Sequence, residues 1–414
     1  MSRKTDNTKT VSREHKLTPI SRGAVRATPV CAFVALLLAQ PGVAGPNEQA
    51  KRIYDRIAGV PPSASELSTM VTAINNNNAL GAANVALAAP QFYNVTLKNM
   101  AMPWTNRDQT VFAPLNDYVA TFVGMVRDDV PFNTALSADL LYTFSSSGLP
   151  APSPANNDHY SNAEANGADM SNSSVLVAKT QSGVYGIPAT ATAGLMTTRG
   201  SASSFFINGT NRAMFRFTLI SQLCRDMEQV QDTSRPPDRI RQDVSRSPGG
   251  DSRIFLNSCI GCHSGMDPMA QAFAYYDFVG TAVGDGTNTG SLQYAQGQPQ
   301  PKYFINATNF PQGFVTPDDS WTNRWRQGPN QVLGWDPSLP GSGNGAKSLG
   351  QELAQSDAFA ACQVQKVFTT VCYRAPTTQA DLTQVASMKG DFKANNKYSM
   401  KQMFAEAAVY CMGN

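Results

Sequence analysis

The chain has 414 residues, enough for two or three domains of ordinary size. Hydrophobic residues make up 42% of it, as in a folded globular protein, whereas charged residues make up only 15%, compared with roughly 25% in an average soluble domain. The formal net charge is only +3, which argues against a protein that binds nucleic acid through a large basic surface.

Residues 1–44 have the pattern of a secretory signal. Basic residues are spread over the first 26 positions, an apolar run follows at 29–39, and Gly42-Val43-Ala44 offers small side chains for cleavage after Ala44. The run is too short for a membrane-spanning helix, and a short membrane anchor is the alternative. The segment contains seven of the 33 basic and two of the 30 acidic residues, so 26 basic and 28 acidic residues remain after cleavage. We therefore expect a periplasmic or extracellular protein with no membrane span after cleavage and no nucleic-acid partner.

Helical signals dominate residues 45–150, which we expect to form an N-terminal helical module. Residues 47–59 have the composition of a helix, and Ser63 followed by Glu66 predicts a capping box that opens a second one. Apolar residues at helical spacing predict a third helix over 115–129. Residues 137–146 could form either a short helix or an extended segment.

Residues 151–345 are expected to form a middle module with long loops. Residues 147–175 are rich in Ser, Pro, Asn and Ala, which is typical of a linker or a surface loop. Residues 211–227 carry the strongest helical pattern up to that point, and 281–347 show little periodicity and are predicted to be irregular.

The last segment, residues 346–414, again has helical patterns and is expected to form a C-terminal helical module. One helix is predicted over 348–373, and two shorter ones follow. The sequence therefore predicts a mainly α, loop-rich fold whose middle module is flanked by helical modules.

The pattern Cys259-Ile260-Gly261-Cys262-His263 is the attachment sequence of a c-type haem. Two thiols one helical turn apart can form thioethers with one haem, and the adjoining His263 can then bind the iron. A zinc site is the first alternative, but it needs a second close pair of ligands. A thioredoxin-like redox pair is the other, and it lacks the βαβ context. We expect one covalent haem c.

The other four cysteines of the mature chain form an even set, which suits an oxidising compartment. Two disulfides can be made in three ways, and the sequence does not choose among them. These cysteines are Cys224, Cys362, Cys372 and Cys411.

The second iron ligand is constrained by the scarcity of histidine. His15 lies in the signal segment, so a bis-histidine site would require His159. Methionine is the other natural partner, and Met196 lies in a stretch of small residues where backbone could approach a flat cofactor. We expect Met196 to be the ligand, with an open iron position as an alternative. Other candidates are His159, Met214, Met388, Met400 and Met403.

Residues 259–280 (CIGCHSGMDPMAQAFAYYDFVG) resemble the haem segment of the multi-module Planctomycete-type cytochromes, whose pattern is roughly CxxCHxxMDPxGxxFExxDxxG. The family's glycine after the MDP sequence is replaced by Ala270, and its glutamate is replaced by Ala274. Residues 56–67, 127–143 and 353–376 resemble other family segments in the same order. The resemblance implies a cytochrome c-like haem segment between the N- and C-terminal helical modules. The matching positions are Met266, Asp267, Pro268, Phe273, Asp277 and Gly280.

The combined expectation is an exported monohaem cytochrome that transfers one electron between redox partner proteins. Asp267 is expected to cap a helix that starts there. One alternative is a peroxidase- or oxidase-like haem enzyme with an open iron position and a nearby Arg199 or Arg253. Another is a haem-containing structural or binding protein of a cell-surface assembly, with tryptophan-bearing loops as its contact surface. The tryptophans concerned are Trp321, Trp325 and Trp335.

Overall fold

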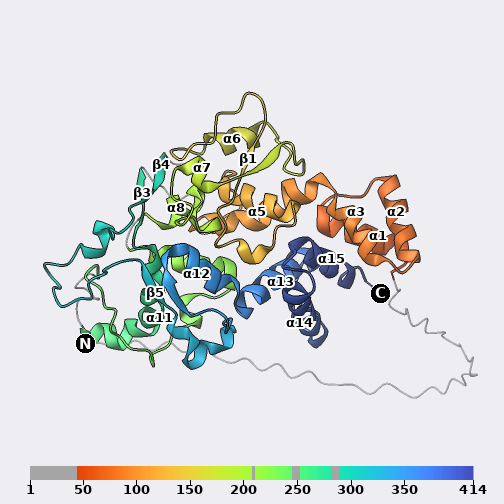
Figure 1. Ribbon diagram of the computed structural model, residues 1–414. Coiled ribbons are helices and arrows are strands. Elements are labelled where there is room, and N and C mark those ends of the chain that lie inside the picture. Colours follow the sequence, from red (N-terminus) through yellow and green to blue (C-terminus); the bar gives the residue numbers. More distant parts are fainter. Residues whose placement is uncertain (1–43, 208–209, 245–251, 281–288, 414) are drawn as a thin grey trace, which may run out of the picture. The chain divides into compact units, whose positions relative to one another are not determined.

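A computed structural model describes residues 44–207, 210–244, 252–280 and 289–413 (Figure 1). The described residues belong to one compact unit, and the predicted signal segment, apart from Ala44, lies outside them. The fold is mainly helical, as predicted, and its strands form only short antiparallel pairs. Within these ranges no helix is long and apolar enough to cross a membrane.

The helices and strands alternate with short 3-10 and π turns, of which η5 (Leu219–Leu223) and η7 (Phe255–Cys259) matter below. The α-helices are α1 (Pro46–Ala58), α2 (Ala64–Asn75), α3 (Ala79–Leu87), α4 (Lys98–Ala101), α5 (Asp117–Arg127), α6 (Asp158–Ala165), α7 (Gln181–Tyr185), α8 (Arg199–Phe205), α9 (Arg212–Thr218), α10 (Ser252–Ile254), α11 (Ile260–Ala270), α12 (Gly345–Ala354), α13 (Asp357–Cys372), α14 (Gln379–Ala394) and α15 (Met400–Tyr410). The strands are β1 (Leu141–Phe144), β2 (Leu176–Lys179), β3 (Tyr276–Gly280), β4 (Gly290–Tyr294), β5 (Ser320–Thr322) and β6 (Ser342–Asn344).

The N-terminal helices form where the sequence predicts them. Helix α2 opens with the expected capping box: the Ser63 hydroxyl accepts from the backbone N–H of Glu66, and the Glu66 carboxylate accepts from the N–H of Ser63 at 2.8 Å. Helix α1 ends at Gly59, which adopts a left-handed φ of 73°. Helices α1 and α3 contact α15 from the far end of the chain (Figure 1).

Helix α5 is buried along its whole length and positions the segment that follows it. Residues 137–146, for which a helix or an extended segment was open, form strand β1, which pairs antiparallel with β2. A β-carbon on Gly124 of α5 would lie 2.2 Å from Cδ1 of Tyr142, so glycine is what allows β1 to pack directly on the helix. The predicted loop over 147–175 is wrong in part, because α6 forms within it and buries His159, Tyr160 and Ala163.

The middle segment departs from prediction in two places. The helix predicted over 211–227 is shorter: α9 passes into the π turn η5, and the chain leaves it at Cys224, whose φ of 53° cannot continue a right-handed helix. Cys224 is bonded to Cys362 of α13, and this tertiary link overrides the local helical pattern. The segment predicted to be irregular over 281–347 contains three strands: β4 pairs with β3, which lies just before the segment, and β5 pairs with β6.

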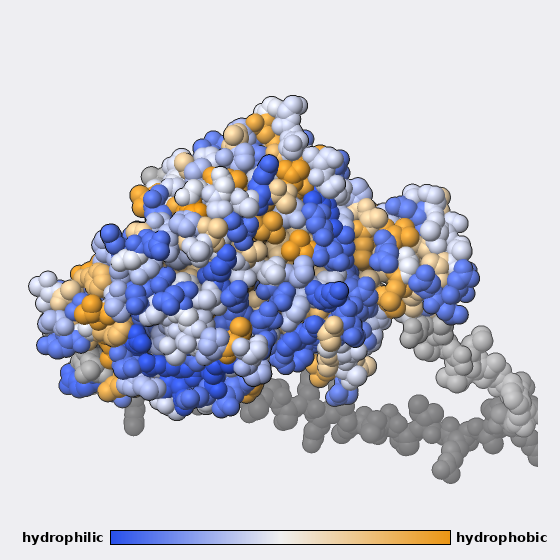
Figure 2. Space-filling model, viewed as in Figure 1, coloured by the Kyte–Doolittle hydropathy of each residue, from blue (hydrophilic) through white to orange (hydrophobic). Residues whose placement is uncertain are grey.

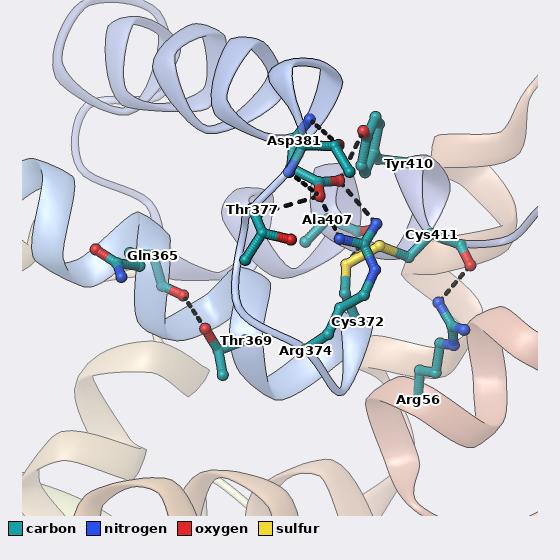
Figure 3. Close-up of a disulfide and its surroundings, with 11 residues drawn as sticks. Arg56, Gln365, Thr369, Cys372, Arg374, Thr377, Asp381, Ala407, Tyr410 and Cys411 are labelled. Carbon is teal, nitrogen blue, oxygen red and sulfur yellow. Dashed lines mark hydrogen bonds and ion pairs between the residues drawn. A yellow bond between two sulfur atoms is a disulfide. The ribbon is translucent and has the colours of Figure 1, made fainter.

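The helix predicted over 348–373 is divided into α12 and α13. Ser356 lies between them and caps α13, because its hydroxyl accepts from the N–H of Phe359 at 3.1 Å. A disulfide then joins Cys372, at the end of α13, to Cys411, just after α15 (Figure 3). Beside it, the Asp381 carboxylate accepts from both terminal nitrogens of the Arg374 guanidinium and from the Tyr410 hydroxyl.

The end of the described chain is also joined to α1. The side chain of Gln49 donates to the carbonyl of Gly413 at 2.8 Å, that of Arg52 to the carbonyl of Met412, and that of Arg56 to the carbonyl of Cys411. On the face shown in Figure 2, hydrophilic residues cover most of the surface, and apolar residues are scattered among them.

Candidate functional site

The Cys259–His263 segment lies where the π turn η7 runs directly into α11. Cys259 ends η7 with a φ of −110° and a ψ of −25°, so the backbone stays helical, and α11 begins at the next residue. Cys262 follows three residues later on this continuous path, which places the two thiols about one turn apart. The structure therefore has the spacing on which the haem prediction depends. Single π turns of this kind occur often at functional sites.

The cysteines divide into two classes. Cys224 is bonded to Cys362, and Cys372 to Cys411, which selects one of the three pairings that the sequence left open. Among the described residues, Cys259 and Cys262 are the free cysteines, and both are partly exposed. Burial, together with the nearby charges of Glu228 and Asp226, raises the pKa of the Cys262 thiol. The two thiols of the motif are thus unpaired and accessible.

His263 directs one ring nitrogen at a carboxylate of its own helix. Its Nδ1 lies 3.0 Å from Oδ2 of Asp267, four residues further along α11. The imidazole is about a quarter exposed, and its centroid lies 5.7 Å from that of the Phe255 ring. Because Nδ1 is occupied, Nε2 is the nitrogen left to bind a metal. The predicted capping role of Asp267 is wrong, since Asp267 lies near the end of α11 and the cap position belongs to Cys259.

Asp267 is itself held by two arginines. Arg212 donates from Nε to Oδ1 of Asp267 at 2.7 Å, and Arg241 lies 3.9 Å from the same oxygen. The other end of Arg212 donates to Asp243 at 2.5 Å. Burial alone would raise the pKa of the Asp267 carboxyl, but the charges of Arg212 and Arg241 outweigh it and hold that pKa well below its usual range. The carboxylate that faces His263 is therefore a charged, fixed acceptor.

A pocket of about 500 Å³ opens beside Cys262. A volume of this order suits a medium-sized organic ligand. Its walls combine apolar or thioether side chains with guanidinium groups and with the carboxylates of Asp226 and Glu228. The apolar groups can hold a flat apolar ring, and the guanidinium groups can pair with carboxylates at its edge. Of the motif, Cys262 lines this pocket, whereas Cys259 and His263 are not among its lining residues. The apolar and thioether side chains are Phe217, Met227 and Met266, and the guanidinium groups are Arg107, Arg212 and Arg216.

Met196 lies in a different place. It is 2% exposed and lines a cavity of only about 10 Å³ together with Met214 and Phe217. Of the side chains in that cavity lining, Phe217 also borders the pocket beside Cys262. The structure therefore brings Cys259, Cys262 and His263 together on one helical segment, but it does not bring Met196 into the lining of the pocket beside Cys262. Its role as second iron ligand stays a prediction.

His159 is engaged at both ring nitrogens. Its Nε2 accepts from the backbone N–H of Phe144 at 2.9 Å, and its Nδ1 lies 2.7 Å from the carbonyl of Pro150. The ring is 1% exposed, and burial lowers its pKa. This arrangement needs a neutral ring with its proton on Nδ1 and leaves no lone pair for iron. His159 therefore has a structural role that competes with a bis-histidine site.

The arginines and tryptophans considered for a haem enzyme or a binding protein also have places in the fold. The Arg199 side chain is buried and donates from Nε to the carbonyl of Gly290 at 2.9 Å, whereas Arg253 is exposed on α10. Trp321 and Trp325 are buried, and the partly buried Trp335 donates to the carbonyl of Trp325 at 2.9 Å. The tryptophans of the predicted contact loops thus pack inward.

Sequence reasoning missed the ionic cluster around Asp267. The spacing of four residues between His263 and Asp267 on a predicted helix was a usable signal, because such residues face each other. Nothing local indicated Arg212, Arg241 or Asp243, which come from two other segments of the chain.

Within the described part of the chain, no group of three or more His, Cys, Asp or Glu side chains is arranged to hold a metal ion. Comparisons with protein-family models, with curated proteins and with solved structures found no match to this chain.

Proposed function

We propose that the protein is an exported monohaem c-type cytochrome that transfers single electrons between redox partner proteins in the periplasm or outside the cell. The observation that carries the proposal is the state of the motif: Cys259 and Cys262 are unpaired, partly exposed and one helical turn apart, while the four other cysteines of the mature chain form disulfides. The two disulfides favour an oxidising compartment.

The donor set fits a covalent haem. Cys259 and Cys262 would form the two thioethers, and His263 would offer Nε2 to the iron because its Nδ1 already faces Asp267. A single histidine is enough for this attachment, whereas a structural zinc site needs four ligands. When bound, the haem supplies an iron centre that gains and loses one electron.

The pocket residues have separable roles in this proposal. Phe217, Met227 and Met266 are the apolar or thioether side chains of the lining and would shield a bound haem from water beside Cys262. Arg107 and Arg216 line the pocket and would offer their guanidinium groups to the carboxylates of a bound haem, although Arg216 already pairs with Asp226 through two hydrogen bonds of 2.7 Å. The apolar and guanidinium side chains suit a cofactor with an apolar body and an anionic rim, whereas Glu228 adds a negative charge to the same lining that such a rim would have to avoid.

The deciding experiment is to express the full chain in a bacterium that attaches haem to exported proteins, and to ask whether haem stays bound after denaturation. We expect covalent haem and a redox titration that follows a one-electron curve. Cys259→Ser and Cys262→Ser should each lower haem attachment strongly, because one thioether is lost in each. His263→Ala should remove the proximal ligand and change the optical spectrum.

A matched control removes cysteines from elsewhere in the chain. The double variant Cys372→Ser/Cys411→Ser loses a disulfide but keeps the motif, so it should still carry haem. Purified wild-type protein without covalent haem would overturn the proposal, and so would a Cys259→Ser/Cys262→Ser variant that retains it.

A further inference from the structure

The carboxylate of Asp267 has a function that the haem motif alone does not include. Resting on the proposed function, we infer that Asp267 is a positioning residue for His263. Its carboxylate keeps the proton on Nδ1, fixes the ring so that Nε2 is the metal-binding nitrogen, and shifts the haem to a lower reduction potential.

The first support is the hydrogen-bond arrangement at Asp267. Oδ1 accepts from Nε of Arg212 at 2.7 Å, and Oδ2 accepts from Nη2 of Arg212 at 3.2 Å. A carboxylate oxygen has two acceptor sites, so Oδ2 has one left for His263, whose Nδ1 lies 3.0 Å away. The carboxylate can therefore hold both partners at once, and His263 does not compete with Arg212.

The second support is the rigidity of the acceptor. The Asp267 side chain is fully buried, as is that of Arg241. The hydroxyl of Thr210 accepts from Arg212 at 2.7 Å and from Arg241 at 2.8 Å, which ties the two guanidinium groups together. With Asp243, the cluster contains two positive and two negative charges. These four charges cancel without a charge on the imidazole of His263, which must be neutral to bind iron.

A carboxylate acceptor changes what the imidazole gives to a metal. Metal-bound histidines commonly donate their second N–H to a carboxylate or a carbonyl, which fixes the tautomer and makes the ligand more basic. A more basic ligand stabilises the oxidised iron, because that state has the higher charge. The expected result is a lower potential than the same His263 would give beside a neutral acceptor.

The test begins with the purified full-length wild-type protein, labelled with ¹⁵N on histidine and studied by NMR at about pH 8.5, where an ordinary histidine is neutral. We expect the His263 ring proton on Nδ1 and slow in its exchange with water. In Asp267→Asn we expect that exchange to be at least tenfold faster, because the amide is a weaker acceptor. Iron on Nε2 would by itself place the proton on Nδ1, so the position of the proton is read in the haem-free Cys259→Ser/Cys262→Ser protein. A proton on Nε2 there would overturn the inference.

The second measurement is the midpoint potential of the haem-loaded protein. Asp267→Asn should raise it by about 59 mV or more, which corresponds to a tenfold change for one electron. Asp267→Glu, which restores the charge, should recover at least half of this shift. The matched control is Asp226→Asn, which removes a negative charge from the pocket lining without contact to His263 and should cause a smaller shift.

The outcomes separate this inference from the proposed function. If the purified protein carries no covalent haem, the proposed function fails, while the NMR measurement still decides which nitrogen of His263 holds the proton. If haem is present and Asp267→Asn shifts the potential no more than Asp226→Asn does, the inference is wrong and the cytochrome stands. If Asp267→Asn does not fold, the ring proton of His263 in the haem-free Cys259→Ser/Cys262→Ser protein decides alone.

Discussion

The backbone of Gly265 packs directly against the indole ring of Trp325, because glycine has no side chain to separate them. A β-carbon on Gly265 would lie 1.9 Å from Nε1 of Trp325, whose ring is fully buried. Helix α11, which carries Cys262 and His263, therefore rests with its backbone on an indole ring. Any side chain at position 265 has to push the helix and the ring apart.

Gly265→Ala should destabilise the protein by about 1–3 kcal/mol, because overpacking a closed core outweighs the gain in helix propensity. Gly390→Ala is the matched control: Gly390 is exposed on α14 with nothing near its would-be β-carbon, so alanine should stabilise by about 0.5–1 kcal/mol. Urea unfolding of both variants measures the two effects. Equal stability of Gly265→Ala and wild type would show that the contact is looser than described.

The two disulfides should be found as Cys224–Cys362 and Cys372–Cys411 when the intact protein is cleaved and its peptides are mapped by mass spectrometry. Replacing both cysteines of one bridge by alanine should lower the free energy of unfolding, because the unfolded chain gains conformational entropy. The expected loss is about 4 kcal/mol for Cys372–Cys411, with its separation of 39 residues, and about 5 kcal/mol for Cys224–Cys362, with its separation of 138. Any bridge that includes Cys259 or Cys262 would contradict the separation of the cysteines into two classes.

His159 should make stability depend on pH in mildly acidic solution. Burial lowers its pKa in the folded protein, so below the ordinary value of about 6.5 the unfolded chain binds a proton that the folded one does not. Stability should therefore fall as the pH is lowered from about 7 to 5, because protonation of Nε2 breaks the bond from Phe144. In His159→Gln this part of the slope should disappear. An unchanged slope, measured by denaturant unfolding at several pH values, would mean that His159 is not the group responsible.

If Met196 is the second iron ligand, the oxidised protein should have a weak far-red methionine-to-iron band, and Met196→Ala should abolish it. Met214→Ala is the matched control, because Met214 lines the same small cavity and its loss should cost a similar ~2–5 kcal/mol without affecting the band. Persistence of the band in Met196→Ala would exclude Met196 and direct attention to Met227, which lines the pocket beside Cys262. A six-coordinate low-spin spectrum in both redox states would exclude the open iron position that a peroxidase needs.

Local signals predicted much of the helical framework. The capping box of Ser63 and Glu66 fixed the start of α2, and the helices α1 and α5 lie within a few residues of their predicted bounds. The Cys259–His263 motif could be found for the same reason, because its spacing is a property of a single helical turn. Chemistry contained within a few consecutive residues can be read before the fold is known.

The remainder depends on contacts between distant segments. The pairing of Cys224 with Cys362 could not be chosen from spacing, and the same bridge shortened the helix predicted around α9. Arg212 and Arg241 meet Asp267 only after three segments have packed together. Residues 141–144 became a strand because β2, more than 30 residues later, offers them a partner. Periodicity within one segment contains none of this information.

The attachment of the last described residues to α1 has a consequence for the order of folding. The bond from Arg56 to the carbonyl of Cys411 closes a separation of 355 residues, the kind of contact that slows folding because a long loop must be closed first. The bridge between Cys372 and Cys411 spans only 39 residues and can gather α13, α14 and α15 beforehand. Helix α1, first out of the ribosome among the described helices, can pack early against α2 and α3 but must wait longest for its contact with α15. Refolding from denaturant should therefore proceed more slowly when the Cys372–Cys411 bridge is reduced.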